Sequence, residues 1–272
     1  MNLQQARIIL RPRKTAETFD LGLRWTARVG GRLYLKLWGV LLLPATLVCF
    51  GLRAVAQWPW PSVWLLASGL AMLLQGAFTI AASRLMFEPE VTVGDVLTQC
   101  VRRLGAYLLG LVATRVVVAL GLLVVLGFPW TWAYGAFVHE AVLLEGHGGF
   151  AGTQRSGKFA SGQYSAVLWL GAGLLVALGL FVVAADQVGG VMLEFVLQLG
   201  RPFGSLSEDG GSAGALLGFF AAVPYLASVR FLHYIDARTR RDGWDLQFAF
   251  LSLVMADRAP GTRAPRSAEK GP

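Results

Sequence analysis

Long apolar runs alternate with short polar and often basic stretches along the chain. Six runs are each close to the roughly 20 residues that cross a bilayer as a helix. They cover 34–56, 62–86, 104–128, 130–145, 164–186 and 212–235. The fourth run is the shortest and contains polar side chains, which makes it the weakest of the set. The pattern predicts an all-α, polytopic helical membrane protein with about six transmembrane helices.

Three other stretches are amphipathic, with a polar and an apolar side when drawn as helices. Over 15–31, an acidic residue and three arginines recur at every fourth position, which aligns them on one side of a helix. They are Asp20, Arg24, Arg28 and Arg32. We expect this helix to lie on the membrane surface. The stretches 92–103 and 189–199 show a similar pattern and are predicted at the inner and outer face, respectively.

Composition agrees with insertion in a membrane. The chain is 55% hydrophobic and 15% charged, whereas soluble domains carry about a quarter charged residues. Three His and two Cys are too few for a metal cluster or a disulfide framework, so we expect neither a cofactor nor a metal.

The distribution of Lys and Arg predicts the orientation. With the N-terminus in the cytoplasm, 21 of the 24 basic residues lie on the inner side. Arg53 and Arg201 then lie near the outer side, and Arg115 lies within a span. Basic residues favour the cytoplasmic side, so both termini are predicted to be cytoplasmic. We attribute the net charge of +8 to orientation and to contact with anionic lipid at that face, and we expect no nucleic acid partner.

These predictions divide the chain into four parts. Residues 1–33 form a cytoplasmic basic amphipathic segment, and 34–236 form the six-span membrane domain. Residues 237–257 are predicted to form a cytoplasmic interfacial helix, and 258–272, rich in Pro, Arg, Gly and Ser, a disordered tail.

The stretch GTQRSGKF at 152–159 nearly matches the phosphate-binding loop G-x-x-x-x-G-K-[ST]. That loop follows a strand and needs a Ser or Thr hydroxyl for Mg²⁺, but here an apolar helix precedes it and Phe159 takes the hydroxyl position. We therefore expect no nucleotide, and predict instead a glycine-rich turn followed by a short basic helix over 151–161. Glu145, just before it, is expected to pair with Arg155.

Two short motifs flank the last two spans. The inner-loop motif consists of Glu145 and Gly146, followed by Arg155 and Ser156. The C-terminal motif follows the last span and consists of Asp236, Arg238, Arg241, Asp242, Gly243 and Asp245. With the basic opening segment, these motifs resemble a bacterial family, the membrane domain of glycerophosphoryl diester phosphodiesterase, and its stand-alone relatives of unknown function.

The resemblance covers most of the chain and implies a six-span helical domain in the bacterial cytoplasmic (inner) membrane. It does not imply phosphodiesterase activity, because in fused members that activity belongs to a separate soluble barrel. Nothing in this chain matches the catalytic His and acidic residues of that barrel.

Two charged residues fall inside predicted spans. Arg115 lies about 13 residues before the turn at 128–130 and Glu140 about 11 after it, so at 1.5 Å per residue both reach a similar depth. We expect them to pair. One interpretation is a structural ion pair that sets helix register, and the other is a polar site in a cavity or groove. His139 lies next to Glu140 in the sequence, and a further interpretation is that the two residues bind a metal or relay protons.

The sequence favours a non-enzymatic membrane protein that acts as a scaffold or accessory subunit and organises lipid or partner proteins. The alternative is a transporter or channel-like component with Arg115 and Glu140 lining a path. A membrane-embedded enzyme ranks third, because only His139, Glu140 and Glu145 approach a catalytic arrangement. Membrane lipids are the expected partners, with a membrane or cytosolic protein as a further candidate.

Overall fold

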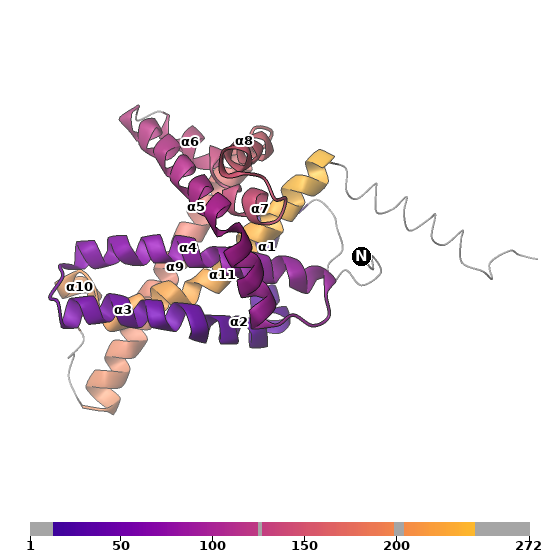
Figure 1. Cartoon of the computed structure of the whole chain (residues 1–272). Coiled ribbons are helices and arrows are strands. Elements are labelled where there is room, and N and C mark those ends of the chain that lie inside the picture. Colours follow the sequence, from indigo (N-terminus) through magenta and orange to yellow (C-terminus); the bar gives the residue numbers. More distant parts are fainter. Residues whose placement is uncertain (1–12, 125–126, 199–203, 243–272) are drawn as a thin grey trace, which may run out of the picture.

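The computed structural model describes residues 13–124, 127–198 and 204–242, and their regular secondary structure is entirely helical (Figure 1). In these ranges, 5 helices are long and apolar enough to cross a membrane. They are Gly31–Ala54, Trp60–Phe87, Val93–Leu123, Tyr164–Val196 and Ala213–Arg241. The prediction of an all-α helical membrane protein is confirmed.

The first span is one part of a long, bent helical segment. It begins with α1 (Thr15–Arg24), and a π-helical turn η2 (Trp25–Val29) connects α1 to α2 (Gly31–Leu37). A second π-helical turn η3 (Trp38–Leu42) leads into α3 (Leu43–Ala54). The predicted polar stripe is present, because Arg24, Arg28 and Arg32 are all exposed, while Trp25 is buried. The predicted amphipathic helix over 15–31 is therefore confirmed as α1 and η2.

The next two spans are α4 (Trp60–Phe87) and α5 (Val93–Leu123). α5 begins with a capping box, in which the Thr92 hydroxyl accepts from the Asp95 backbone N–H and the Asp95 carboxylate accepts from the Thr92 N–H. The predicted surface stretch over 92–103 forms the first turns of this same helix and is not a separate element.

The predicted continuous span over 130–145 is wrong. The chain forms two short helices there, α6 (Phe128–Tyr134) and α7 (Val138–Leu143), separated by a turn. Gly135 lies at the break, where a Cβ atom would meet the Thr114 side chain at 3.2 Å. Glycine also favours helix termination, because it loses the most backbone conformational freedom when it is fixed in a helix.

The chain then continues through α8 (Gly149–Ala160), α9 (Tyr164–Val191) and α11 (Ala213–Asp242). α8 confirms the predicted short basic helix over 151–161. The predicted separate surface helix over 189–199 is wrong, since α9 runs on to Val191 and continues as a π-helical turn η4 (Met192–Val196). The short helix α10 (Leu206–Asp209) precedes α11.

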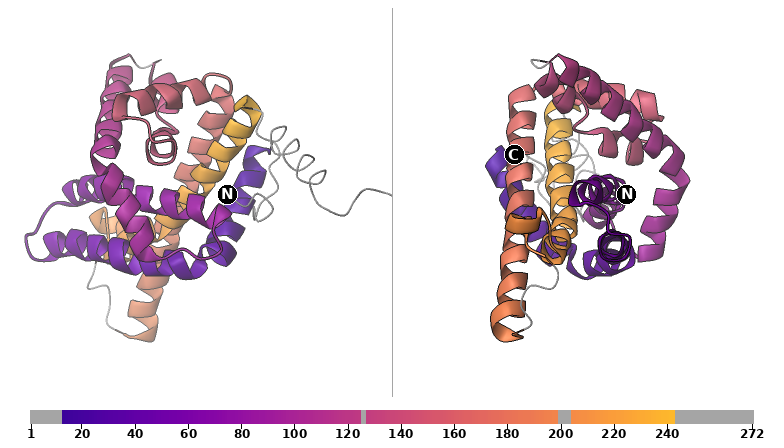
Figure 2. Two further views of the ribbon diagram at one scale, coloured as in Figure 1. Left: turned by 45° about the vertical axis from the view of Figure 1, so that its right-hand side comes forward. Right: turned by 90° about the vertical axis from the view of Figure 1, so that its left-hand side faces the viewer.

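Helix α11 lies at the centre of the bundle. In its most apolar window 67% of the residues are buried, against 17% for the α9 span. α9 runs antiparallel beside it, because Gly218 of α11 packs against Phe181 while Gly214 packs against Ala185. Figures 1 and 2 show α3 and α4 side by side, crossing the α9–α11 pair, with α5 to α8 grouped beside them.

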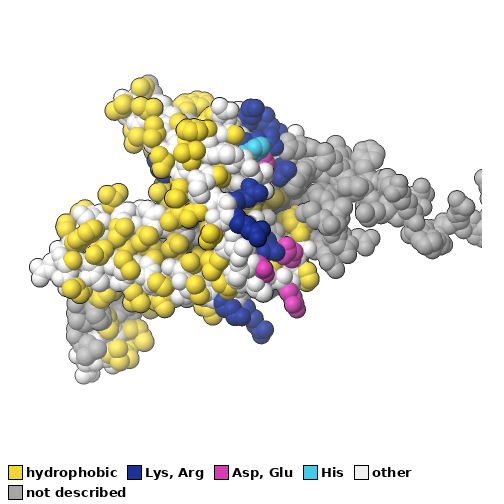
Figure 3. Space-filling view, viewed as in Figure 1, with side chains coloured by type: hydrophobic (Ala, Val, Ile, Leu, Met, Phe, Trp, Pro, Cys, Tyr) yellow, Lys and Arg dark blue, Asp and Glu magenta, His cyan; other side chains and the backbone are white. Residues whose placement is uncertain are grey.

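Charged side chains gather at one end of the bundle. Figure 3 shows Lys and Arg in a band at this end, with acidic residues beside them, while the flanks are largely apolar. The described helices α1, η2, α2, α5, α8 and the end of α11 carry exposed basic residues: Arg24, Arg28, Arg32, Lys36, Arg102, Lys158, Arg240 and Arg241. We call this end the basic end and the other the opposite end.

Candidate functional site

Glu145, in the loop between α7 and α8, is the centre of a polar network at the basic end. Its side chain is 7% exposed, and its two oxygens receive different partners. Oε1 accepts from the Tyr234 hydroxyl at 2.7 Å and lies 3.5 Å from Arg238 Nη1. Oε2 accepts from Arg155 Nε at 2.8 Å and lies 3.1 Å from His147 Nε2. The Glu145 network, as we call these five residues, joins the α7–α8 loop and α8 to α11 and confirms the predicted pairing of Glu145 with Arg155.

Burial alone would raise the pKa of Glu145. The hydrogen bonds from Arg155 and Tyr234 and the charge of Arg238 outweigh this effect, so its pKa is lowered from the ordinary value. The carboxylate form is thus the one that the folded protein holds.

Gly146 follows Glu145 with a φ of +78°, which is favourable only for glycine. A Cβ atom here would also collide with the guanidinium of Arg103, whose Nη1 lies 3.5 Å from the Val142 carbonyl oxygen. The Glu145-Gly146 pair of the inner-loop motif thus has two roles: the first residue binds α8 and α11, and the second lets the loop turn beside α5.

Ser156, the last residue of the inner-loop motif, stabilises the break between α6 and α7. Its hydroxyl donates to the Tyr134 carbonyl at 2.6 Å and accepts from the Phe137 backbone N–H at 3.0 Å. Arg230 of α11 donates through Nη2 to the Ala136 carbonyl. Backbone groups released by a helix break need such partners inside a membrane, where water is scarce.

Asp236 of the C-terminal motif holds the start of the described chain. One carboxylate oxygen accepts from the Arg13 backbone N–H at 2.6 Å, and the other from Arg240 Nε at 2.9 Å. Arg240 also donates to the Arg13 carbonyl at 2.6 Å. The basic segment at the start of the sequence and the basic motif after the last span therefore contact each other at one end of the bundle.

The remaining residues of the C-terminal motif lie in different places in the structure. Arg238 belongs to the Glu145 network. Arg241 lies over the Phe159 ring, with 5.9 Å between its Cζ and the ring centroid, and donates to the Lys158 carbonyl. α11 ends at Asp242, while Gly243 and Asp245 lie outside the described residues, as do most of the predicted 237–257 helix and the whole 258–272 tail.

The predicted pairing of Arg115 with Glu140 is wrong. Both carboxylate oxygens of Glu140 are buried without a hydrogen-bond partner in the described chain. Arg115 Nη2 instead donates to the Met72 sulfur at 2.7 Å, which is a weak acceptor. The prediction assumed a continuous helix after the turn at 128–130, and the break at Gly135 removes the depth relation on which it depended.

Arg230 is the charged residue that acts on Glu140 electrostatically, and it also acts on Arg115. With Arg115 it lines a small cavity of about 60 Å³ between α5, α6, α9 and α11. A charge in a span costs at least about 2.5–3.5 kcal/mol unless it is paired or hydrated. Sequence reasoning did not find this arrangement, because Arg230 falls near the end of the last apolar run, where basic side chains commonly extend to the membrane interface.

His139 lies in a hydrogen-bond chain with Tyr107. The Tyr107 hydroxyl donates to the Met72 carbonyl at 2.8 Å and lies 2.6 Å from His139 Nδ1. The hydroxyl has a single proton, so Nδ1 carries a proton and donates to the tyrosine oxygen. This tautomer leaves Nε2 as a buried acceptor without a partner. Among the described residues no group of three or more His, Cys, Asp or Glu could hold a metal ion.

Two grooves open at the basic end. One, of about 520 Å³, lies between the end of α8 and the end of α11 and is lined by Lys158, Arg240 and Arg241 with Ser161 and Gln163. We call it the α8–α11 groove. The other, of about 840 Å³, lies between the end of α4 and the start of α5 and contains Arg84, Arg102 and Arg103 with Glu88 and Asp95.

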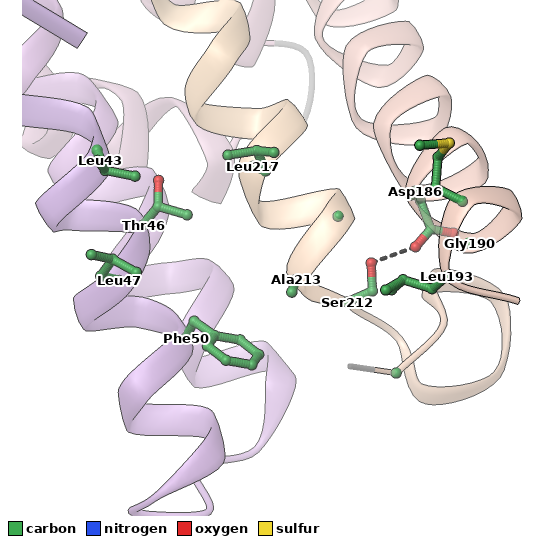
Figure 4. A pocket seen from close by; sticks show the side chains of 14 residues that line it. Leu43, Thr46, Leu47, Phe50, Asp186, Gly190, Leu193, Ser212, Ala213 and Leu217 are labelled. Atoms are coloured by element: carbon green, nitrogen blue, oxygen red, sulfur yellow. Dashed lines mark hydrogen bonds between the residues drawn. The ribbon is translucent and has the colours of Figure 1, made fainter. Parts of the chain in front are cut away.

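A third groove, of about 360 Å³, lies at the opposite end between α3, α9 and α11 and is mostly apolar (Figure 4). Asp186 of α9 is 7% exposed and accepts a hydrogen bond from the Ser212 hydroxyl. The Ser212 oxygen also accepts from the Ala215 N–H at 2.9 Å. Asp186 therefore fixes the start of α11 against α9.

Comparisons of the chain with protein-family models, with curated proteins and with solved structures found no match. The resemblance to the phosphodiesterase membrane domain stays a prediction.

Proposed function

We propose that this chain is a non-enzymatic integral membrane protein, a scaffold or accessory subunit that gathers anionic lipid at its basic end. The observation that carries the proposal is the band of Lys and Arg at one end of an otherwise apolar bundle (Figure 3). By the preference of basic residues for the cytoplasmic side, this end faces the cytoplasm of a bacterial cell. As a second candidate function, the same end binds a partner protein.

The α8–α11 groove supports the choice of an anionic headgroup. Three of its lining residues are basic, and Lys158, Arg240 and Arg241 are all exposed. Arg241 and Lys158 come from two helices that the Glu145 network holds together, so the groove is preformed. Basic residues near a membrane surface each contribute about 1 kcal/mol to binding of anionic lipid, and salt screens the effect.

Removal of two charges from this groove tests the proposal. In Lys158→Gln/Arg241→Gln, affinity for phosphatidylglycerol should fall by about 2 kcal/mol, roughly 30-fold. Native mass spectrometry of the detergent-solubilised protein, titrated with phosphatidylglycerol or phosphatidylcholine, measures the preference. Arg53→Gln, at the opposite end, is the control and should keep it. Equal affinity of wild type for the two lipids would contradict the proposal.

The alternative function, a transporter, requires a ligand near Arg115. The cavity that Arg115 and Arg230 line is the observation that favours it.

A further inference from the structure

The cavity between α5, α6, α9 and α11 brings two arginines together inside the bundle. Arg115 and Arg230 both line it, and they interact electrostatically with each other. In the described chain the hydrogen-bond acceptors of their side chains are neutral: the Met72 sulfur for Arg115 and the Ala136 carbonyl for Arg230. In the described chain neither guanidinium forms an ion pair with a carboxylate. Two like charges at one cavity in an apolar surrounding repel each other and are stabilised by an anion between them.

Glu140 supplies part of this negative charge, but not in contact. Its carboxylate is 0% exposed and lacks a hydrogen-bond partner, and Arg230 is the charge that acts on it. Even with Glu140 ionised, one carboxylate against two guanidiniums leaves the cluster with an excess of at least one positive charge. Arg115 is the more accessible of the two arginines, because its side chain is exposed whereas Arg230 is partly buried.

Beside the two arginines, the cavity has room for only a small group. Its volume of about 60 Å³ suits a carboxylate or phosphate group rather than a whole amphiphile. Thr114 lies on the α5 wall, and Trp132 and Gly135 face it from α6 and the following turn. Gly171 of α9 packs so closely on Trp132 that any side chain there would displace the indole.

The surface of α5 around Arg115 is apolar, since Val112 and Val116 are 60% and 52% exposed. On α9, Leu174 lines the cavity, and Leu175 and Val176, which follow it in sequence, are 63% and 64% exposed. A ligand that reaches Arg115 from this side must therefore pass along a surface made for hydrocarbon.

We propose that Arg115 and Arg230 bind the oxyanion head of a single-chain anionic amphiphile, a carboxylate or a phosphate, which enters from the membrane with its chain along α5 and α9. The head fits the cavity, and its charge neutralises the excess positive charge. The chain covers the exposed apolar side chains beside Arg115. This site shares no lining residue with the α8–α11 groove. A negative result at one of the two sites therefore leaves the proposal for the other unaffected.

Photo-crosslinking tests this site with the full-length protein in phosphatidylcholine nanodiscs. The probes are a diazirine-bearing fatty acid and a diazirine-bearing lysophosphatidic acid, with the neutral diazirine-bearing monoacylglycerol as control. We expect the anionic probes to label peptides of α5 and α9, and excess unlabelled oleate to compete. Labelling of the same peptides by the neutral probe to the same extent would overturn the proposal.

Variants separate charge from folding. Arg115→Gln should reduce anionic labelling at least tenfold, and Arg115→Lys should retain most of it, because a cation remains. Arg53→Gln is the matched control and should label as wild type. Val118→Trp narrows the cavity but keeps both arginines, and should also reduce labelling. Full labelling of Arg115→Gln, with a melting temperature equal to that of wild type, would refute the site.

Inorganic phosphate distinguishes the source of the anion. Competition by 10 mM phosphate as strong as that by oleate would assign the site to an anion from water and overturn entry from the membrane. Failure of phosphate to compete, with competition by oleate, is the result that the proposal expects.

Discussion

At the scale of single residues, Glu145 illustrates how one buried carboxylate can connect distant parts of a membrane protein. It holds Arg155 of α8 and both Tyr234 and Arg238 of α11. Hydrogen bonds to charged groups contribute more than neutral ones, and loss of one partner leaves the other buried charge uncompensated. The attachment of α8 to the bundle therefore depends strongly on this one side chain.

Glu145→Gln should lower the free energy of unfolding by about 2–4 kcal/mol at pH 7. Because folding lowers the pKa of this carboxyl, its contribution is present above its unfolded pKa and is lost as the pH falls through its lower folded pKa. The difference between wild type and variant should thus shrink in acid. Unfolding in mixed detergent micelles over a pH series measures it, with the exposed Glu90→Gln as control. A difference that stays constant with pH would contradict this role.

At the scale of elements, the pair α6–α7 is the part of the fold that departs most from its predicted form. Hydropathy indicated a span there, but a helix break inside an apolar run leaves little trace in composition. The break is stabilised from outside the segment, by Ser156 of α8 and Arg230 of α11. A sequence pattern cannot reveal that support, because the partners lie 19 or more positions away.

Ser156→Ala should cost about 1–3 kcal/mol of stability, since the Tyr134 carbonyl and the Phe137 N–H would both lose their partner in a buried place. Hydrogen exchange should also increase in α6 and α7 before the rest of the bundle. Ser161→Ala is the control, because that hydroxyl is exposed and bonds only to the Lys158 carbonyl 2.9 Å away. Stability and exchange equal to wild type would show that the break persists without this hydroxyl.

At the scale of the whole molecule, the long spans were predictable and their partners were not. A long apolar run must form a helix in a bilayer because its backbone groups find no water there, so five of the six predicted runs appear as long helices. Their limits differ most in two cases, since the α5 span starts at Val93 rather than at 104 and the α9 span runs to Val196 rather than to 186. The amphipathic α1 and the pairing of Glu145 with Arg155 were also predictable, the first from periodicity and the second from charge and proximity in sequence. The Arg115–Glu140 contact failed because it relied on a helix that the chain does not form.

The arrangement of charge is a property of the whole molecule as well. Arg13, Asp236 and Arg240 come together only after the chain has folded back on itself. The sequence indicated two basic segments, and the fold unites them on one end. The proposed gathering of anionic lipid is a consequence of this union rather than of either segment alone.

The most direct measurement is purification of the tagged full-length protein from its native membranes in a lipid-preserving polymer, followed by mass spectrometry of lipids and proteins. The account predicts anionic lipid enriched over the bulk membrane, with the enrichment reduced in Lys158→Gln/Arg241→Gln, or a stoichiometric protein partner bound at the basic end. Lipid identical in composition to the bulk membrane, without such a partner, would contradict it.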